Sequence, residues 1–588
     1  MKRYQPAAMA LGALALLAPA QTQAGHAEGT VVAPAGDNGR CVAIGRSMQG
    51  QWLDKGTRLL SSVFHQAGPG PAAPGPPGMA MSPSQLPAHC EIVGVMNERT
   101  GVDGQHYAIR FHLRLPERWN GRFLFQGGGG TNGNLGDAVG MLGSAAEPAL
   151  VQGFAVLSQD SGHDNVTNSP PDKGGPVAFG LDPQARADYG SASLAPVTLA
   201  AKALIRSYYG DKPRYSYFFG CSKGGQEGMM LAQRYPQLYD GIVAASPGFS
   251  LPRAAIGESW NTQAFASVVK AEGRPVTPAT LAASFSDLDL DLMRKAVLAA
   301  CDGDDGAVDG MVLDFRRCTS MKVVPKLRAL ACAGGTKTDA CLKPSQIDAL
   351  IRVHDGARDG KGHQIYPGFP WDSGWSNPGW RIWMTGSADG RIPSLNVAMG
   401  APSLAAVFTT PPVVIGGGLQ GGLDYALGFD MDRDASKVDA VAPPFTRSAW
   451  EDIAARSSNL DSFRKYGGKL IVPQGVSDPV FSINDTLAWY QEVDGRYEGK
   501  ASGFVRVFPV PGMNHCSGGP STDQFDALAA IMAWVEQNKR PDMMDAVAGP
   551  MSPWPGRKRP LCPFPEVAHA IKGPDGSEQS FACVAARS

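Results

Sequence analysis

A serine lies at the centre of a glycine-rich turn, and a cysteine stands directly before it. Residues 220–224 read Gly-Cys-Ser-Lys-Gly, with Ser222 in the middle. A strand-like run precedes this turn and a helix-like run follows it, which is the context that a nucleophile elbow requires. The backbone N–H of Lys223 would then face an oxyanion. The pattern indicates a nucleophilic serine, and an ordinary strand–helix turn is the alternative.

A nucleophilic serine needs a general base, and the base needs an acid that orients it. On this kind of fold the chain order is serine, acid, histidine. Two histidines remain late in the chain, and His515 lies in a glycine-rich loop directly after a strand-like run, whereas His569 lies in the C-terminal tail. We predict His515 as the base and Asp478 as the acid. Asp485 is the alternative acid, although we expect it to lie in the next helix.

A second glycine-rich segment, FQGGGGTNG at residues 125–133, follows an early strand-like run. Four successive glycines let a backbone approach a substrate closely, and such a run supplies the second oxyanion N–H in some esterases. We predict that Gly128 or Gly129 is this donor. A merely flexible loop is the alternative.

The elements that must position these residues are strands alternating with helices. Alternation runs from about residue 106 to residue 250 and returns after residue 460, and it predicts a parallel, doubly wound sheet. The rhythm weakens between these parts, where aromatic residues and four cysteines gather. We therefore expect one core built from residues 25–250 and 456–588, with an inserted domain at 251–455.

The N-terminus reads as an export signal. Two basic residues precede an apolar run, and a small-residue cleavage pattern ends at Ala24, so we predict a signal peptide at residues 1–24 and a periplasmic or secreted protein. The 588 residues carry a formal net charge of −1, which favours neither nucleic acid nor a membrane as a partner. The sequence does not predict an oligomeric state.

Ten cysteines in an exported chain suggest disulfides, with buried thiols as the alternative. If the hydroxyl of Ser222 meets the imidazole of His515, their neighbours Cys221 and Cys516 come within bonding range. Three further pairs are close in sequence and are plausible for that reason: Cys301 with Cys318, Cys332 with Cys341, and Cys562 with Cys583.

An acidic, glycine-rich loop, CDGDDGAVDGMV, runs from residue 301 to residue 312. Carboxylates and backbone carbonyls are the hard oxygen ligands that Ca²⁺ prefers, although the spacing is not that of an EF-hand. The loop therefore favours a calcium site, with a solvated acidic turn as the alternative.

These motifs, together with GGKLIVPQGVSDP and PGMNHCSGG, resemble the tannase and feruloyl esterase family over nearly the whole mature chain. The resemblance implies an α/β-hydrolase fold with a large inserted lid domain. It implies Ser222, Asp478 and His515 as the triad, with a Cys221–Cys516 bridge beside it. It further implies the other four pairings, Cys41–Cys90 among them, and a structural calcium in the lid, bound by the side chains of Asp302, Asp305 and Asp309 and the carbonyls of Ala307 and Met311. Lys223 and Gln474 depart from the residues usual in the family.

The resemblance implies hydrolysis of a small aromatic-acid ester, such as a feruloyl, galloyl or related ester, through an acyl-enzyme and without an organic cofactor. The lid tryptophans Trp371, Trp375, Trp380 and Trp383 are candidates to flank the acyl group or to form lid core. Two alternatives stay open: an α/β-hydrolase acting on a terephthalate monoester, an aliphatic polyester oligomer or a peptide, and a non-catalytic binding protein on the same scaffold.

Overall fold

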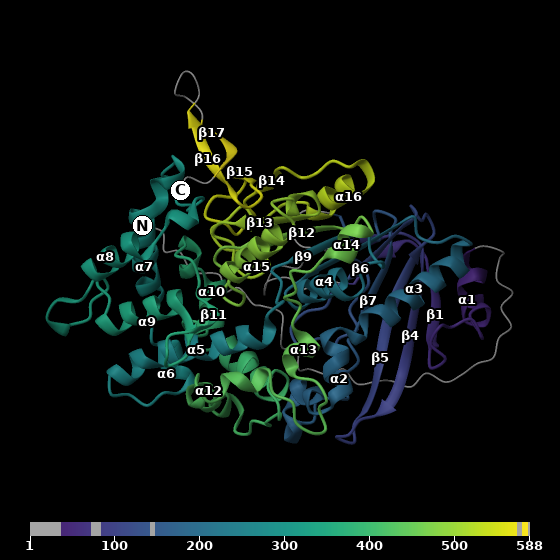
Figure 1. Ribbon diagram of the computed structural model, residues 1–588, viewed down its shortest axis with the longest axis horizontal. Coiled ribbons are helices and arrows are strands. Elements are labelled where there is room, and N and C mark those ends of the chain that lie inside the picture. The colour runs from purple at the N-terminus through teal and green to yellow at the C-terminus, as the bar shows by residue number, and fades with distance from the viewer. Residues whose placement is uncertain (1–36, 72–83, 141–146, 573–578, 586–588) are drawn as a thin grey trace.

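The computed structural model describes residues 37–71, 84–140, 147–572 and 579–585 (Figure 1). The predicted signal peptide lies outside these residues. A single nine-stranded sheet organises the chain, in the order β1-β4-β5-β7-β6-β8-β9-β12-β13. Its strands are β1 (Arg58–His65), β4 (His89–Thr100), β5 (His106–Pro116), β6 (Arg122–Gln126), β7 (Ala155–Gln159), β8 (Tyr215–Cys221), β9 (Gly241–Ala245), β12 (Lys469–Gly475) and β13 (Val505–Val510).

The sheet is parallel from β7 through β13, and β1, β4 and β5 extend one edge as antiparallel strands. The predicted mixed α/β class with a central parallel sheet is confirmed. The sequence reading singled out neither β1 nor β4. Short connections join β4 to β5, as antiparallel strands allow, whereas the parallel strands need helical crossovers.

Alternate residues of the strands point to opposite faces of the sheet, and each face is covered by helices. Phe123, Phe125 and Val472 pack on one face with α3 (Leu194–Tyr209), α4 (Lys223–Arg234) and α15 (Ile483–Arg496). Leu124 and Ile471 pack on the other face with α16 (Ala527–Gln537). The result is a three-layer arrangement in which the parallel strands are buried on both faces, whereas the edge strand β1 is half-buried or exposed.

Between β9 and β12 the chain adds no strand to the main sheet. This stretch is mostly helical. Its helices are α5 (Leu251–Ala271), α6 (Pro278–Ala282), α7 (Asp287–Cys301), α8 (Ser320–Ala329), α9 (Pro344–Asp355), α10 (Pro378–Met384), α11 (Ala401–Ala406), α12 (Gly418–Gly428), α13 (Ala449–Ile453) and α14 (Asp461–Lys465), with the hairpin β10 (Gly356–Arg358) and β11 (Gln364–Pro367). Figure 1 shows α6, α7, α8, α9 and α12 on the opposite side of the molecule from β1, β4 and β5.

The segments at the two ends of the described chain add small elements. At the N-terminal end, α1 (Asp37–Ser47) packs on β1 and α3, and a short ladder pairs β2 (Gly68–Pro69) with β3 (Gln85–Leu86). At the C-terminal end, two ladders pair β14 (Met544–Val547) with β15 (Lys558–Leu561) and β16 (Glu566–Lys572) with β17 (Gln579–Ala585).

Candidate active site

Ser222 occupies the sharp turn between β8 and α4. Its φ of 65° and ψ of −121° lie in a region that side-chain-bearing residues rarely adopt. Two glycines permit this turn by close packing. A Cβ at Gly220 would come within 2.6 Å of the carbonyl carbon of Gly224, and a Cβ at Gly224 would come within 2.7 Å of the Gly128 oxygen. The strained serine therefore lies at the C-terminal edge of the sheet.

Asp478 and His515 are brought together by the loops that follow β12 and β13. The Nδ1 atom of His515 lies 3.0 Å from Oδ2 of Asp478. The fully buried carboxylate also accepts the backbone N–H groups of Val480 and Phe481, at 2.9 and 3.2 Å, on Oδ1. These contacts fix the acid in position to orient the imidazole.

The alternative acid and the other late histidine lie in different surroundings. Asp485 is in α15, as expected, and its Oδ1 accepts Nε of Arg456 at 3.1 Å. His569 lies in β16, in the C-terminal ladder. Neither makes a contact with Asp478 or His515 within the described part of the chain.

A hollow opens directly over the serine. Ser222 lines it, and so do Trp383 and Phe481. The rings of Trp383 and Phe481 stand edge-on to the His515 ring, with centroids 5.7 and 5.4 Å away. The serine and the rings that flank the histidine therefore face one space. The remaining predicted tryptophans, Trp371, Trp375 and Trp380, stack with one another in the core and do not line this hollow.

A disulfide joins Cys221 to Cys516, with their Cα atoms 6.0 Å apart. It ties the residue before the serine to the residue after the histidine, across 295 residues of sequence. The disulfide therefore holds the turn of Ser222 close to the loop of His515. Four more disulfides are present, and together these are the five pairings that the resemblance implied: Cys41–Cys90, Cys301–Cys318, Cys332–Cys341 and Cys562–Cys583 complete the set.

The predicted oxyanion donors differ in whether another group already accepts their N–H. Lys223 is the first residue of α4, so its N–H has no partner within the helix. In the glycine run, the N–H of Gly128 is already given to Glu227 at 3.0 Å. No acceptor engages the Gly129 N–H among the described residues. Of the two predicted glycines, the structure leaves Gly129 available.

The Lys223 side chain is held in a buried ion pair. Its Nζ lies 3.1 Å from Oε1 of Glu227 and 4.6 Å from the ring centre of Tyr189. Burial lowers the pKa of Lys223, and the charge of Glu227 opposes that shift. Glu227 also accepts Nδ2 of Asn132 at 2.8 Å. Sequence reasoning missed Glu227, although its spacing of four residues from a lysine in a predicted helix was visible.

Gln474 supports the acid loop and does not line the hollow. Its side chain is fully buried, donates to the Phe481 carbonyl at 2.7 Å and accepts the Thr486 hydroxyl at 2.5 Å. The glutamine therefore braces the loop that carries Asp478.

The acidic loop folds back on its own aspartates. Asp302 accepts the N–H of Gly310 at 3.0 Å, Asp305 accepts the N–H of Leu313 at 2.9 Å, and Asp309 pairs with Arg559. Burial raises the pKa of Asp305 to about 6, and the neighbouring aspartate charges add to that shift. The donor types suit a hard cation, but across the described ranges no group of three or more His, Cys, Asp or Glu side chains is arranged to hold a metal ion.

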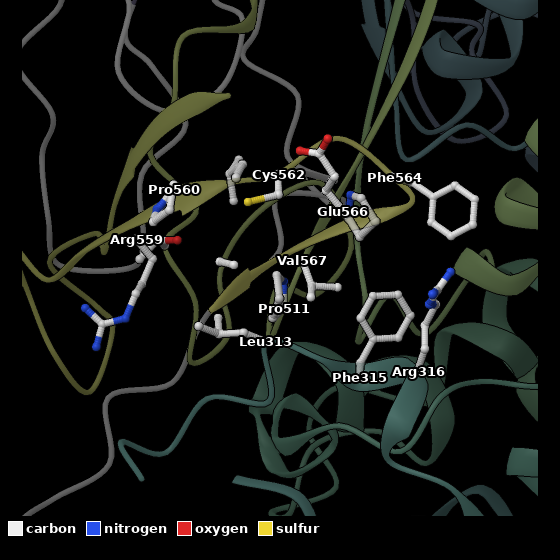
Figure 2. Close-up of a pocket in the computed structure, with 14 residues that line it drawn as sticks. Leu313, Phe315, Arg316, Pro511, Arg559, Pro560, Cys562, Phe564, Glu566 and Val567 are labelled. Atoms are coloured by element: carbon white, nitrogen blue, oxygen red, sulfur yellow. The ribbon is translucent and has the colours of Figure 1, made fainter. Parts of the chain in front are cut away.

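A second hollow lies between the segment after the acidic loop and the C-terminal strands (Figure 2). Leu313 and Phe315 line one side, and Pro560, Cys562 and Phe564 lie across from them. Its lining includes no serine and no histidine among the residues that the structure describes. It reflects the packing of the C-terminal strands on the helical stretch and lacks the groups for acyl transfer.

No helix in the described part of the chain has the length and apolar character needed to cross a membrane.

Comparison with known proteins gives one consistent group of relatives. A sequence profile described as "Tannase and feruloyl esterase" matches residues 90–584. The chain is 41% identical, over 560 residues, to a mono(2-hydroxyethyl) terephthalate hydrolase from Piscinibacter sakaiensis, covering 91% of this chain and 89% of that protein. It is 28% identical to a probable feruloyl esterase from Arthroderma benhamiae, covering 87% and 88% of the two chains.

Solved structures share the fold. The crystal structure of feruloyl esterase B from Aspergillus oryzae aligns with a TM-score of 0.71 at 21% identity, covering 93% of this chain and all of that one. A tannin acyl hydrolase from Aspergillus niger aligns with a TM-score of 0.62 at 18% identity, covering 92% and 94%.

Proposed function

Since the chain belongs to the tannase and feruloyl esterase family, we propose that this carboxylic ester hydrolase cleaves aromatic-acid esters with a Ser222–His515–Asp478 triad. One observation carries the proposal. The strained Ser222 lines a hollow together with Trp383 and Phe481, and these two rings pack against the imidazole that contacts Asp478. The 3.0 Å contact between Nδ1 of His515 and the Asp478 carboxylate supports the role of histidine as base, because it leaves Nε2 to receive a proton.

The proposed reaction is acyl transfer through a covalent intermediate. The Ser222 hydroxyl attacks the ester carbonyl while Nε2 of His515 takes its proton. The imidazolium then gives that proton to the leaving alcohol. A water molecule, deprotonated by the same nitrogen, attacks the acyl-enzyme and releases the acid, and the proton returns to Ser222. The N–H groups of Lys223 and Gly129 stabilise the negative oxygen in both steps.

An aromatic acyl group is supported by the lining of the hollow. Trp383, Phe408, Phe481 and Tyr189 supply ring surface around the serine. Flat aromatic surfaces bury a benzene ring with favourable stacked or edge-on contacts. A terephthalate monoester is the second candidate, because the 41% identical relative is named for such a substrate.

A panel of esters with one common alcohol tests the proposal. We expect methyl ferulate and methyl gallate to be hydrolysed with kcat/KM at least about tenfold above that for methyl hexanoate, because only the aromatic acids fill the ring-lined hollow. The measurement is initial rates of acid release, with a mono(2-hydroxyethyl) terephthalate arm beside them. Faster hydrolysis of the aliphatic ester than of every aromatic one contradicts the aromatic assignment, and hydrolysis of peptides alone contradicts the esterase chemistry.

We propose that residues 251–455 form a lid domain on a core made of residues 25–250 and 456–588. The absence of any strand of the main sheet between β9 and β12 supports this division. Trp383, from α10 of this stretch, reaches the serine's hollow, which is what a lid requires. The five disulfides support export to the periplasm or the exterior, where such bonds persist.

A structural calcium in the acidic loop is a further proposal, with the carboxylates of Asp302, Asp305 and Asp309 and the carbonyls of Ala307 and Met311 as ligands. Burial raises the pKa of Asp302 and Asp305, and the charge of Asp309 adds to the shift, so a cation beside these carboxylates would favour their charged forms. The aspartates would have to exchange some backbone N–H donors for the ion. When bound, the ion would hold this loop in place.

Removing calcium should lower the thermal stability. We expect dialysis against EGTA to reduce Tm by about 2–5 °C and added Ca²⁺, but not Mg²⁺, to restore it, since an ion that binds only the folded chain stabilises it. Differential scanning calorimetry measures the change. An Asp302→Asn/Asp305→Asn variant is the control and should not respond to Ca²⁺. An identical Tm of the native chain in EGTA and in Ca²⁺ rules out the site.

A further inference from the structure

The hollow over Ser222 contains a carboxyl group that has no partner. Glu258 lines it from α5 and is 7% exposed. It lies two helical turns after Leu251, which lines the same hollow, so both residues occupy one face of the helix. No hydrogen bond or ion pair engages its carboxyl oxygens among the described residues. The carboxyl group faces the hollow, so its hydrogen-bonding capacity is available to a group that binds there.

A glycine makes room for this carboxyl group. A Cβ at Gly400 would lie 1.9 Å from Oε2 of Glu258. Gly400 has the right-handed helical conformation, with φ of −62° and ψ of −52°, which any residue adopts. Its backbone therefore does not require glycine, which is unfavourable inside a helix. Glycine is required at this position because the carboxyl group of Glu258 occupies the space that a Cβ would fill.

Burial favours the neutral form of the Glu258 carboxyl group. Burial alone raises the pKa of Glu258 to about 8. Among the described residues that line the hollow, Lys223 is the only cation, and it is engaged by Glu227. A protonated carboxyl donates one hydrogen bond and accepts another, so it suits a hydroxyl group. A ring carboxylate would be buried here without a free cation, which is unfavourable.

We propose that Glu258 is a specificity-determining residue that binds a hydroxyl group on the aromatic ring of the acyl group. The proposal rests on the proposed esterase function and deepens it. It commits to the acyl side because the acyl group stays attached to Ser222, which lines this hollow, while the alcohol departs. It also predicts discrimination against acyl rings that carry a free carboxylate.

Methyl esters test this, because the alcohol is then constant. The substrates are methyl cinnamate, its 2-, 3- and 4-hydroxy derivatives, and monomethyl terephthalate. For the native chain we expect the best hydroxycinnamate to exceed methyl cinnamate in kcat/KM by about tenfold or more, since leaving a site's polar group unpaired penalises the analogue. Monomethyl terephthalate should be about tenfold or more below that hydroxycinnamate.

Three variants separate hydrogen bonding from shape. Glu258→Gln keeps a neutral donor and acceptor and should retain the hydroxyl preference within about threefold. Glu258→Leu keeps similar bulk without polar atoms and should abolish the preference by lowering only the hydroxycinnamate rate. Gly400→Ala leaves Glu258 in the sequence but places a methyl group where its carboxyl lies, and it should behave as Glu258→Leu does.

The outcomes distinguish the proposed role of Glu258 from the proposed esterase function on which it rests. Each variant is checked for Tm and for labelling of Ser222 by a fluorophosphonate, which depends on the triad and not on the acyl ring. If the native chain hydrolyses the esters but the hydroxyl preference is absent, or is equal in the native, leucine and alanine forms, the role of Glu258 is overturned while the esterase stands. If the native chain neither labels nor hydrolyses any ester, both are overturned.

Discussion

Replacing Ser222 with alanine should lower kcat for ester hydrolysis by about a millionfold, since loss of the nucleophile from a triad removes nearly all covalent catalysis. The protein should stay folded. The strained turn keeps a Cβ in alanine, and the neighbouring Cys221–Cys516 bond still holds the turn to the base loop. Tm should therefore change by no more than about 2 °C. Hydrolysis of the best aromatic ester and labelling by a fluorophosphonate are the two measurements.

Ser207→Ala is the matched control for this variant. Ser207 lies in α3, and its hydroxyl shares an exposed hydrogen bond with Ser47 at 2.9 Å. Its removal should leave kcat/KM within about twofold of the native value, because surface changes away from special features have small effects. Labelling that persists in Ser222→Ala would place the nucleophile elsewhere, and it would remove the basis for every role assigned to the hollow.

The residues of the proposed triad could be selected from the sequence because each follows a strand that the hydrophobic pattern shows. Carboxyl ends of parallel strands meet at one edge of a sheet, so a serine after β8, an acid after β12 and a histidine after β13 converge there. The Cys221–Cys516 pairing follows from the same geometry. The structure confirms the strands and helices that the alternating pattern predicted for the core.

The edge strand β1 was not predicted because its pattern of apolar and polar residues is interrupted. Two adjacent leucines precede two adjacent serines, and the register shifts between Leu59 and Ser61, so no continuous period of two appears in its sequence. It is recognised only through its pairing with β4, which the one-dimensional pattern does not contain.

Glu258 and Gly400 also could not be predicted, because nothing in the sequence joins them. Glu258 is one acidic residue in a helix that is buried on most sides, so no polar face marks it as unusual. Gly400 reads as one more glycine in a glycine-rich chain. The three-dimensional structure shows that both residues line the hollow. It also shows that the carboxyl group of Glu258 occupies the space that a side chain at Gly400 would need.

Asp478→Asn should lower kcat by about ten-thousandfold, and the hydrogen bonds of the acid explain why. The Oδ1 atom of Asp478 accepts two backbone N–H groups, from Val480 and Phe481. An asparagine would keep its carbonyl oxygen at that position. Its NH2 group would then occupy the place of Oδ2, which lies 3.0 Å from Nδ1 of His515. Oδ1 lies 3.1 Å from the same nitrogen, but it already accepts the two backbone N–H groups, so Oδ2 is the oxygen that is left to accept from Nδ1.

That NH2 group can only donate, so it would select the tautomer of His515 in which Nδ1 accepts a hydrogen bond. The imidazole proton would then sit on Nε2, the nitrogen assigned to receive the proton of Ser222. The base would be present in the right place but in the wrong protonation state. Fluorophosphonate labelling should slow along with ester hydrolysis, because both reactions need a deprotonated Nε2.

Asp485→Asn separates this effect from a general loss of buried charge. Asp485 is also buried and also follows β12, but its carboxylate contacts Arg456 and not His515. Its substitution should reduce Tm through the lost ion pair while kcat stays within about threefold of native. Equal losses of kcat in the two variants would show that the acid loop matters only for folding. A larger loss of kcat in Asp485→Asn than in Asp478→Asn would contradict the assignment of Asp478 and would favour Asp485 as the acid.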